Sequence, residues 1–231
     1  GGDVDGGGLF GLCLSVDLDH YSKFNLGLPH GRPLRCADGS TWRGRARLGR
    51  PRSASLGQSL ARADRERIGL AYLEDALDEH ASVPAFERLA LELAAHGAPR
   101  LLIERARAAA AEEIHHARTC FAFASAYLGR DVRVPDLPYT RVRHARPLQA
   151  IARESWWDGC VGEAIAAEVV RARAAETHAA LERQALHGIA RDEQGHARLA
   201  AEVVVWAAGV SSVQNDVRNC LAAEAMNRLE I

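Results

Sequence analysis

The chain has 231 residues, of which 48% are apolar, and its formal net charge at pH 7 is −1. This apolar content is enough to bury one substantial core. The near-neutral balance excludes the basic surface that nucleic-acid binding requires. No stretch approaches the roughly 20 uninterrupted apolar residues of a membrane span. We therefore expect neither a nucleic-acid partner nor a membrane-spanning segment.

The five cysteines are widely separated, odd in number and never arranged as CxxC. This pattern argues against a disulfide framework and favours reduced thiols. The Gly-rich start lacks a basic region followed by an apolar one, so no signal peptide is visible. The first residue is not Met, as in a chain that is processed or cut from something longer. We expect a cytoplasmic protein.

The chain divides into two parts by composition. Residues 1–60 are rich in Gly and Pro, and only 9–18 and 41–48 have the character of short strands. From about Asp64 onward the sequence is dominated by Ala, Leu, Glu and Arg, which favour helices. The composition predicts an irregular N-terminal extension over residues 1–60 and a helical domain over residues 61–231.

Four long helices and a short C-terminal one are predicted in the helical domain. Gly97 followed by Pro99 ends the first helix, and Gly129 ends the second. A Pro-rich connection after Gly129 is long enough to cross the length of a bundle. Short connections otherwise join neighbours, so we expect an all-α four-helix bundle with a long crossover between helices 2 and 3. The predicted helices cover residues 64–96, 99–128, 148–176, 179–208 and 212–229.

Each long helix has a seam of apolar residues that recur at alternating steps of four and three, as on a face that points into a bundle. Each seam carries a glutamate near its middle, and two seams add a histidine three residues later. A buried carboxylate is normally paired, protonated or bound to a metal. The seams offer too few cations to pair with all of these carboxylates, so metal ions are the economical explanation. The candidate ligands are Glu79, Glu113, His116, Glu163, Glu193 and His196.

The spacing of these residues supports a shared site. Glutamate and histidine at positions i and i+3 lie on one helix face. Glu79 precedes the turn at 97–99 by about as many residues as Glu113 follows it, and the second hairpin repeats this arrangement. All four glutamates should therefore meet at one level. Four carboxylates balance two divalent ions, and oxygen-rich ligation with imidazole suits Fe or Mn better than structural Zn.

This pattern resembles the ferritin-like di-iron carboxylate superfamily, including its rubrerythrin-like and bacterioferritin-like members. The stretches Glu79–Val83 and Gly159–Glu163 are also similar to an uncharacterised bacterial ferritin-like group with no activity to transfer. The resemblance implies a ferritin-like bundle with two iron ions. It further implies that Glu113 and Glu193 bridge the metals and that the other two glutamates are terminal ligands.

The sequence departs from the family pattern in two places. Pro84 lies about one turn after Glu79 and removes a backbone hydrogen bond, so a kink or bulge is expected there. His115 and Gly195 stand where the family motif has arginine, so its usual Arg–Asp contact is not expected.

Four further residues are candidates for contacting the metal ligands without binding a metal themselves: Glu112, Asp192, Cys120 and Cys160. Glu112 lies off the seam and is expected to support a ligand or to face solvent. Both cysteines lie on the seam, where packing is the favoured role and redox chemistry the alternative. Tyr72 and Tyr127 also point inward, and we interpret them as packing residues.

Three functions are consistent with this constellation. The leading hypothesis is an oxidoreductase that uses O2 or H2O2 with two iron ions, or with manganese in their place, on a small-molecule or protein substrate. The second is a ferroxidase for iron storage or detoxification. The third is a non-catalytic interaction module that binds a partner through residues 1–60. The sequence leaves the substrate and a homodimeric state open.

Overall fold

The computed structural model describes residues 31–36, 38, 40–134, 136–138, 144–210 and 214–229. This part of the chain is mostly helical, which confirms the all-α prediction. The predicted strand at 9–18 lies outside the described residues.

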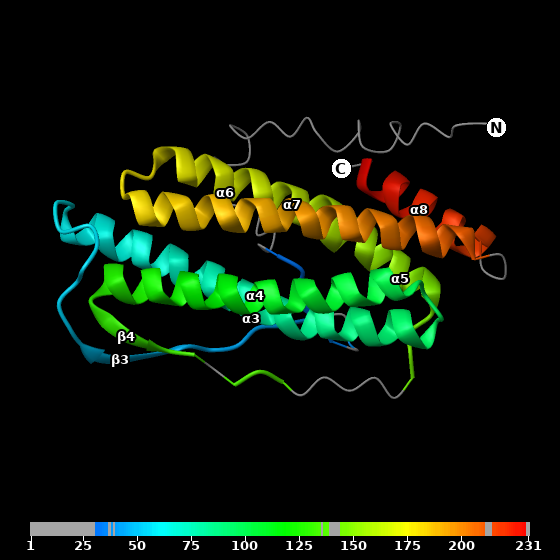
Figure 1. Ribbon diagram of the computed structural model, residues 1–231, viewed down its shortest axis with the longest axis horizontal. Coiled ribbons are helices and arrows are strands. Elements are labelled where there is room, and N and C mark those ends of the chain that lie inside the picture. Colours follow the sequence, from blue (N-terminus) through cyan, green and yellow to red (C-terminus); the bar gives the residue numbers. More distant parts are fainter. Residues whose placement is uncertain are drawn as a thin grey trace.

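The long helices form two hairpins that lie side by side (Figure 1). The first hairpin consists of α3 and α4, and the second consists of α7 packed against the continuous run of α5, η1 and α6. Every predicted helix boundary lies within two residues of the observed one. The helices are α3 (Arg62–Ala95), α4 (Arg100–Leu128), α5 (Leu148–Glu154), η1 (Ser155–Glu163), α6 (Ala164–Glu176), α7 (Ala180–Gly209) and α8 (Gln214–Leu229).

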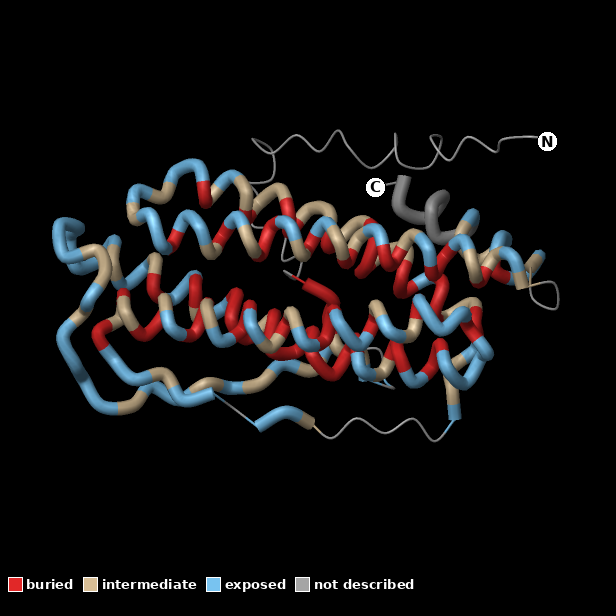
Figure 2. The backbone as a smooth tube through the Cα atoms, in the orientation of Figure 1, coloured by how far each residue is buried: buried red, intermediate tan, exposed pale blue. Residues whose placement is uncertain are grey.

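The predicted seams face the interior. Their residues are buried, except that Phe123 and Trp156 are half-buried. Buried apolar side chains form one cluster around Tyr72, Leu186 and Ile189 and another around Leu93, Ile151 and Val203. The first cluster includes residues from the start of α3 and the second includes residues from its end, and buried positions run along both hairpins between them (Figure 2). The candidate ligands therefore lie between two apolar layers.

One segment departs from the regular helix that the seam predicts. The third helical run contains a π-helix, η1, in which the backbone hydrogen bonds span five residues and the turn is wider. Helix α3 continues on both sides of Pro84, beside which we expected a kink or bulge. Gly159 in η1 allows the close approach of α7, because a Cβ there would lie 2.4 Å from Ala200 Cβ. η1 thus packs closely against α7 beside the candidate ligand Glu163.

A methyl group at Gly159 should destabilise the fold, because the backbones of η1 and α7 are held by their helical hydrogen bonds and cannot easily move apart. Gly159→Ala is expected to lower the free energy of unfolding by about 1–3 kcal/mol through overpacking. Gly188→Ala is the matched control, since a Cβ there meets nothing within 4 Å. It should raise the stability by about 0.5–1 kcal/mol, as expected for Gly to Ala inside a helix. Urea unfolding of both variants checks the pair, and equal effects would contradict the packing described here.

Two short antiparallel ribbons connect the extension to the helices. β1 (Leu34–Arg35) pairs with β2 (Thr41–Trp42), and β3 (Arg47–Pro51) pairs with β4 (Arg130–Arg133). The predicted strand at 41–48 is therefore divided into two short pieces, and β1 and β4 are strands that the sequence pattern did not predict. The second ribbon fastens the start of the crossover to the extension.

A short segment of the extension enters the space between the hairpins (Figures 1 and 2). We call this segment, Gly31–Pro33, the inner strap. Gly31 has a φ of +81°, and a Cβ there would lie 2.6 Å from Ser82 Oγ. Arg32 is fully buried and donates hydrogen bonds to Glu154 Oε1 at 3.2 Å and to Ser155 Oγ at 3.3 Å. The strap therefore joins α3 to the opposite hairpin.

Glu154 is the centre of a buried ionic network. It accepts hydrogen bonds from Arg32, from Arg88 at 3.2 Å and from Arg146 at 2.6 Å. Burial opposes ionisation of this carboxyl, but the three guanidiniums lower its pKa to about 2. Because the folded pKa is depressed, the ionised carboxylate stabilises the fold above about pH 4.5, and this contribution is lost as the pH falls toward 2.

The network predicts an acid-dependent contribution to stability. A shift of this size corresponds to at most about 3 kcal/mol. At pH 7, Glu154→Gln should be less stable than the wild type by an amount of this order. The difference should shrink as the pH falls from 5 toward 2, which urea unfolding at several pH values would show. A difference that does not change with pH would mean that the carboxylate's charge does not hold the network.

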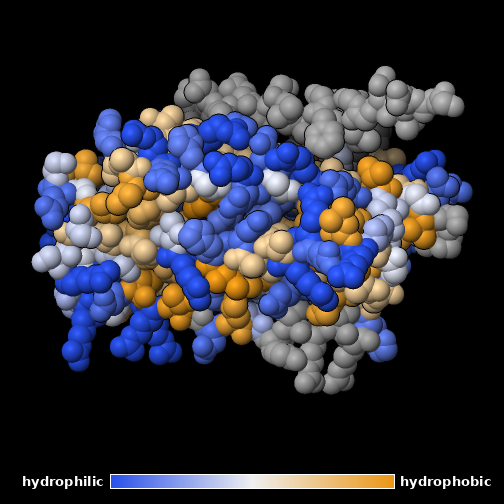
Figure 3. All heavy atoms as spheres, viewed as in Figure 1, coloured by the Kyte–Doolittle hydropathy of each residue, from blue (hydrophilic) through white to orange (hydrophobic). Residues whose placement is uncertain are grey.

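The visible face in Figure 3 carries mostly hydrophilic side chains with hydrophobic ones between them. Among the described residues, no helix combines the length and the apolar character that crossing a membrane requires. This finding agrees with the absence of a membrane span in the sequence.

Candidate metal centre

The six candidate ligands meet in the middle of the helical domain, and none is more than 3% exposed. Their ligand atoms fall into two groups, and within each group these atoms lie within 4.8 Å of one another. The first group contains Glu79, Glu113, His116 and Glu193, and the second contains Glu113, Glu163, Glu193 and His196. Glu113 and Glu193 belong to both groups, which is the geometry needed to bridge two ions.

The two halves of the site repeat each other. His116 Nδ1 lies 3.2 Å from Glu193 Oε1 and 3.6 Å from Glu113 Oε2. His196 Nδ1 lies 3.2 Å from Glu113 Oε1 and 3.6 Å from Glu193 Oε2. Each histidine is thus closer to the glutamate of the other helix than to that of its own motif. The two shared carboxylates lie between the two imidazoles.

The outer nitrogens of both histidines contact carboxylates of the other hairpin. His116 Nε2 lies 3.1 Å from Asp192 Oδ2, and His196 Nε2 lies 2.9 Å from Glu112 Oε2. Each carboxylate belongs to the residue that precedes a shared glutamate. When Nε2 donates its proton outward, the lone pair of Nδ1 faces the shared glutamates, as a metal ligand requires. Glu112 and Asp192 are therefore positioned to fix the orientation of the two imidazole rings.

Many inward-facing atoms of the site lack a hydrogen bond. Buried polar atoms are normally satisfied, and leaving a carboxylate without a partner costs several kcal/mol. A cation at the centre would give these atoms a partner. Among the described residues, the unsatisfied atoms of the site are Glu79 Oε2, both oxygens of Glu113, Glu163 and Glu193, His116 Nδ1 and His196 Nδ1.

The four carboxylates differ in their ionisation. Burial, together with the charge of a neighbouring shared glutamate, raises the pKa of Glu79 and of Glu163. Burial acts on Glu193 in the same direction, but its contacts with Glu163 and with both histidines hold its pKa well below the usual value. Burial and the charge of Glu193 act to raise the pKa of Glu113, but its contacts with both histidines lower it overall, so the shared carboxylates are the more readily ionised pair. Metal binding at Glu79 and Glu163 would displace protons from them.

The outer carboxylates should matter for metal affinity even though they touch no metal. Glu112→Gln and Asp192→Asn are each expected to weaken metal binding by about 10–100-fold, because the ligand imidazoles lose their orientation. Glu168→Gln is the matched control, since Glu168 pairs with Arg171 at the protein surface. Competition with a chelating dye measures all three affinities. Unchanged affinity in both outer variants would contradict this role.

The two seam cysteines are buried among apolar side chains. Cys120 belongs to the cluster around Tyr72, and Cys160 packs with Ala200 and Val204. Burial, with a contribution from Glu79, raises the pKa of the Cys120 thiol well above its usual value. A thiol in this environment is a poor nucleophile, so packing explains its position better than redox chemistry does.

Glu182 is one of several buried acids that the sequence interpretation missed. Glu182 is 3% exposed and accepts hydrogen bonds from the hydroxyls of Tyr72 at 2.5 Å and Tyr127 at 2.9 Å. Both tyrosines therefore form a polar contact as well as packing. Glu182 lies four residues before the seam residue Leu186, so extending the seam by one turn would have found it.

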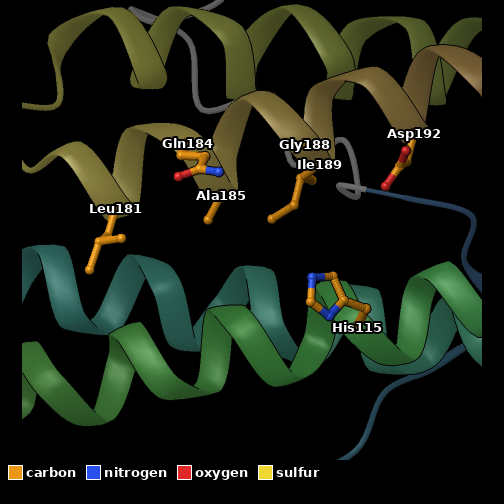
Figure 4. Close-up of a pocket in the computed structure, with 7 residues that line it drawn as sticks. All are labelled: His115, Leu181, Gln184, Ala185, Gly188, Ile189 and Asp192. Atoms are coloured by element: carbon orange, nitrogen blue, oxygen red, sulfur yellow. The ribbon is translucent and has the colours of Figure 1, made fainter.

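A pocket of about 330 Å³ lies between α4 and α7. Figure 4 shows His115 reaching from α4 toward the facing side chains of α7. Asp192, which contacts the buried candidate ligand His116, forms part of the lining and is the partly exposed member of that pair. The lining residues are His115, Leu181, Gln184, Ala185, Gly188, Ile189 and Asp192.

Comparison with known proteins does not assign this chain to a family. No family model, no curated protein and no solved structure matches the chain significantly. A function must therefore be argued from the geometry and chemistry of the site.

Proposed function

We propose that the two hairpins form a ferritin-like four-helix bundle that holds two divalent metal ions, preferentially iron, at the six buried ligands. The observation that carries this proposal is the convergence of unsatisfied carboxylate and imidazole atoms into two overlapping groups. Each group offers three carboxylates and one imidazole. This donor set suits iron or manganese.

The charges of the site support two ions rather than one. Four carboxylates and two neutral histidines carry four negative charges, and two divalent ions balance them. A neutral centre removes most of the cost of burying the carboxylates between apolar clusters. Glu113 and Glu193, which belong to both groups, would bridge the ions, and Glu79 and Glu163 would each bind one.

We propose further that this centre makes the protein an oxidoreductase that uses O2 or a peroxide. Bound ferrous ions would supply the electrons for reducing either oxidant. The chain's own residues hold the geometry: the shared glutamates keep the two positions close, and the outer carboxylates fix the imidazole rings. The apolar clusters on both sides exclude water from the centre.

The test separates metal binding from reactivity. Anaerobic loading with Fe(II), followed by gel filtration and elemental analysis, should give about two ions per chain, as expected for a di-metal carboxylate bundle. Subsequent addition of O2 or H2O2 should consume oxidant and produce a near-UV or visible charge-transfer band. A content below about one ion per chain would contradict the metal centre. Full loading without oxidant consumption or a band would contradict only the oxidoreductase.

A further inference from the structure

The inner strap, Gly31–Pro33, is the part of the extension that enters the interior of the helical domain. All three of its residues are buried, whereas none of the described residues from 34 to 60 is. Figure 2 shows this buried segment in the space between the two hairpins. Burial therefore distinguishes the strap from the rest of the described extension.

Gly31 lies against an oxygen of a candidate ligand. A Cβ on Gly31 would be 3.4 Å from Glu79 Oε2 and 2.6 Å from Ser82 Oγ. Among the described residues, Glu79 Oε2 has no hydrogen-bond partner, and it lies 3.9 Å from Nδ1 of the candidate ligand His116. Gly31 also has a φ of +81°, which residues with a side chain rarely adopt. A glycine therefore lets the strap lie this close to Glu79.

Contacts with both hairpins hold the strap in this position. Arg32 donates hydrogen bonds to Glu154 and Ser155 of the second hairpin. Arg35, two residues after the strap, donates two hydrogen bonds of 2.6 Å to Asp158 of η1. The backbone carbonyl of Arg35 accepts a hydrogen bond from Arg88 of α3. The strap can therefore move away from Glu79 only when buried or partly buried hydrogen bonds are broken.

From these observations we infer that the inner strap is part of the metal centre: Gly31 positions the carboxylate of Glu79, and the strap covers the metal position that Glu79 serves. The atoms nearest to a Cβ on Gly31 all belong to α3, and Glu79 is the candidate ligand on that helix. The effect should therefore fall on one metal position and spare the other. This inference rests on the proposed function, because it concerns the binding and exchange of an ion at that same site.

Gly31→Ala tests the positioning of Glu79. The added methyl group should displace the strap or the carboxylate, so that one Zn(II) ion binds as in the wild type and the other binds about 10–100-fold more weakly. Competition with a chelating dye measures both affinities. Gly97→Ala is the matched control, because Gly97 also has a positive φ, of +70°, but a Cβ there meets nothing within 4 Å. Two unchanged affinities in Gly31→Ala would overturn the positioning role.

Combined variants identify the weakened position. Glu163→Gln removes a ligand of the second group only, so adding Gly31→Ala should weaken the remaining ion by the same about 10–100-fold. Glu79→Gln removes the ligand on which Gly31 acts, so adding Gly31→Ala there should change the remaining affinity by less than about twofold. A general structural defect would weaken the remaining ion equally in both backgrounds, and that result would also overturn the positioning role.

Arg35→Gln tests whether the strap covers its metal position. Loss of the hydrogen bonds to Asp158 should loosen the strap and speed the release of one Zn(II) ion to an excess of chelator by about tenfold. Arg52→Gln is the matched control, because Arg52 also belongs to the extension but pairs with Asp131, at 3.3 Å, in the second ribbon. Release from Arg35→Gln at the wild-type rate would show that the strap is not a cover.

Two further measurements separate this inference from the proposed function. Circular dichroism checks the folding of each variant, and Arg35→Gln, at a partly exposed side chain, carries the test if Gly31→Ala does not fold. The metal content of the wild-type protein is measured first. Wild-type protein that binds both ions, with variants that bind and release them in the same way, defeats only the role of the strap. A wild-type content below about one ion per chain defeats the proposed metal centre, and the role of the strap with it.

Discussion

Glu113→Gln is expected to abolish binding at both metal positions, whereas Glu163→Gln should abolish binding at one. The reason is that Glu113 belongs to both ligand groups and Glu163 to only one. After anaerobic Fe(II) loading, the content should fall from about two ions per chain to near zero in the first variant and to about one in the second. Elemental analysis after gel filtration measures the three values.

The comparison has an internal reference and a matched control. Glu193→Gln should behave like Glu113→Gln, and Glu79→Gln should behave like Glu163→Gln, because the site is symmetric. Glu168→Gln, at the surface, should retain both ions. Equal losses of metal in Glu113→Gln and Glu163→Gln would contradict the inference that Glu113 contributes to both metal positions.

Metal loading should stabilise the fold strongly. A ligand present at about 1,000 times its dissociation constant adds about 4 kcal/mol to the free energy of unfolding, so two such sites would add about 8 kcal/mol. The stabilisation should be large because the metal-free site is unfavourable. Burial raises the pKa of Glu79 and of Glu163 and disfavours their ionised forms when no cation is bound. Urea unfolding with and without Zn(II), a redox-inert probe, measures the difference.

This second prediction is checked by reversal. Addition of a chelator should return the loaded protein to its original midpoint, and Glu113→Gln should show almost no shift with Zn(II). A similar shift in Glu113→Gln would place the stabilising ion elsewhere. Identical midpoints with and without metal would contradict the centre itself.

Local periodicity made it possible to predict from the sequence both the helices and the meeting of the six side chains. The steps of four and three that place Tyr72 and Leu186 inside also place Glu79 and Glu193 inside, so local periodicity determines which residues share the interior. The glycine turns and short connections then set the level at which they meet. These are local properties, and a single sequence contains them.

The features that the sequence did not predict depend on contacts between distant segments. Arg32 lies in an extension without periodicity, and its burial follows from Glu154 and Ser155, more than 120 residues away. The π-helix η1 was likewise not predicted, and its Gly159 packs closely on Ala200 of the distant helix α7. Pro84, by contrast, is a local signal that predicts a kink or bulge, and α3 continues on both sides of it as one helix.

The crossed arrangement of the ligand groups also has a consequence for how the protein is made. Each group takes three members from one hairpin and one from the other. During synthesis the first hairpin emerges with three donors for one ion, but it lacks Glu193 until the second hairpin has docked. On the proposed function, a stable metal complex therefore forms only after docking, and each ion then acts as a cross-link that opposes separation of the hairpins. Metal uptake by the nascent protein would therefore indicate that its two hairpins have docked.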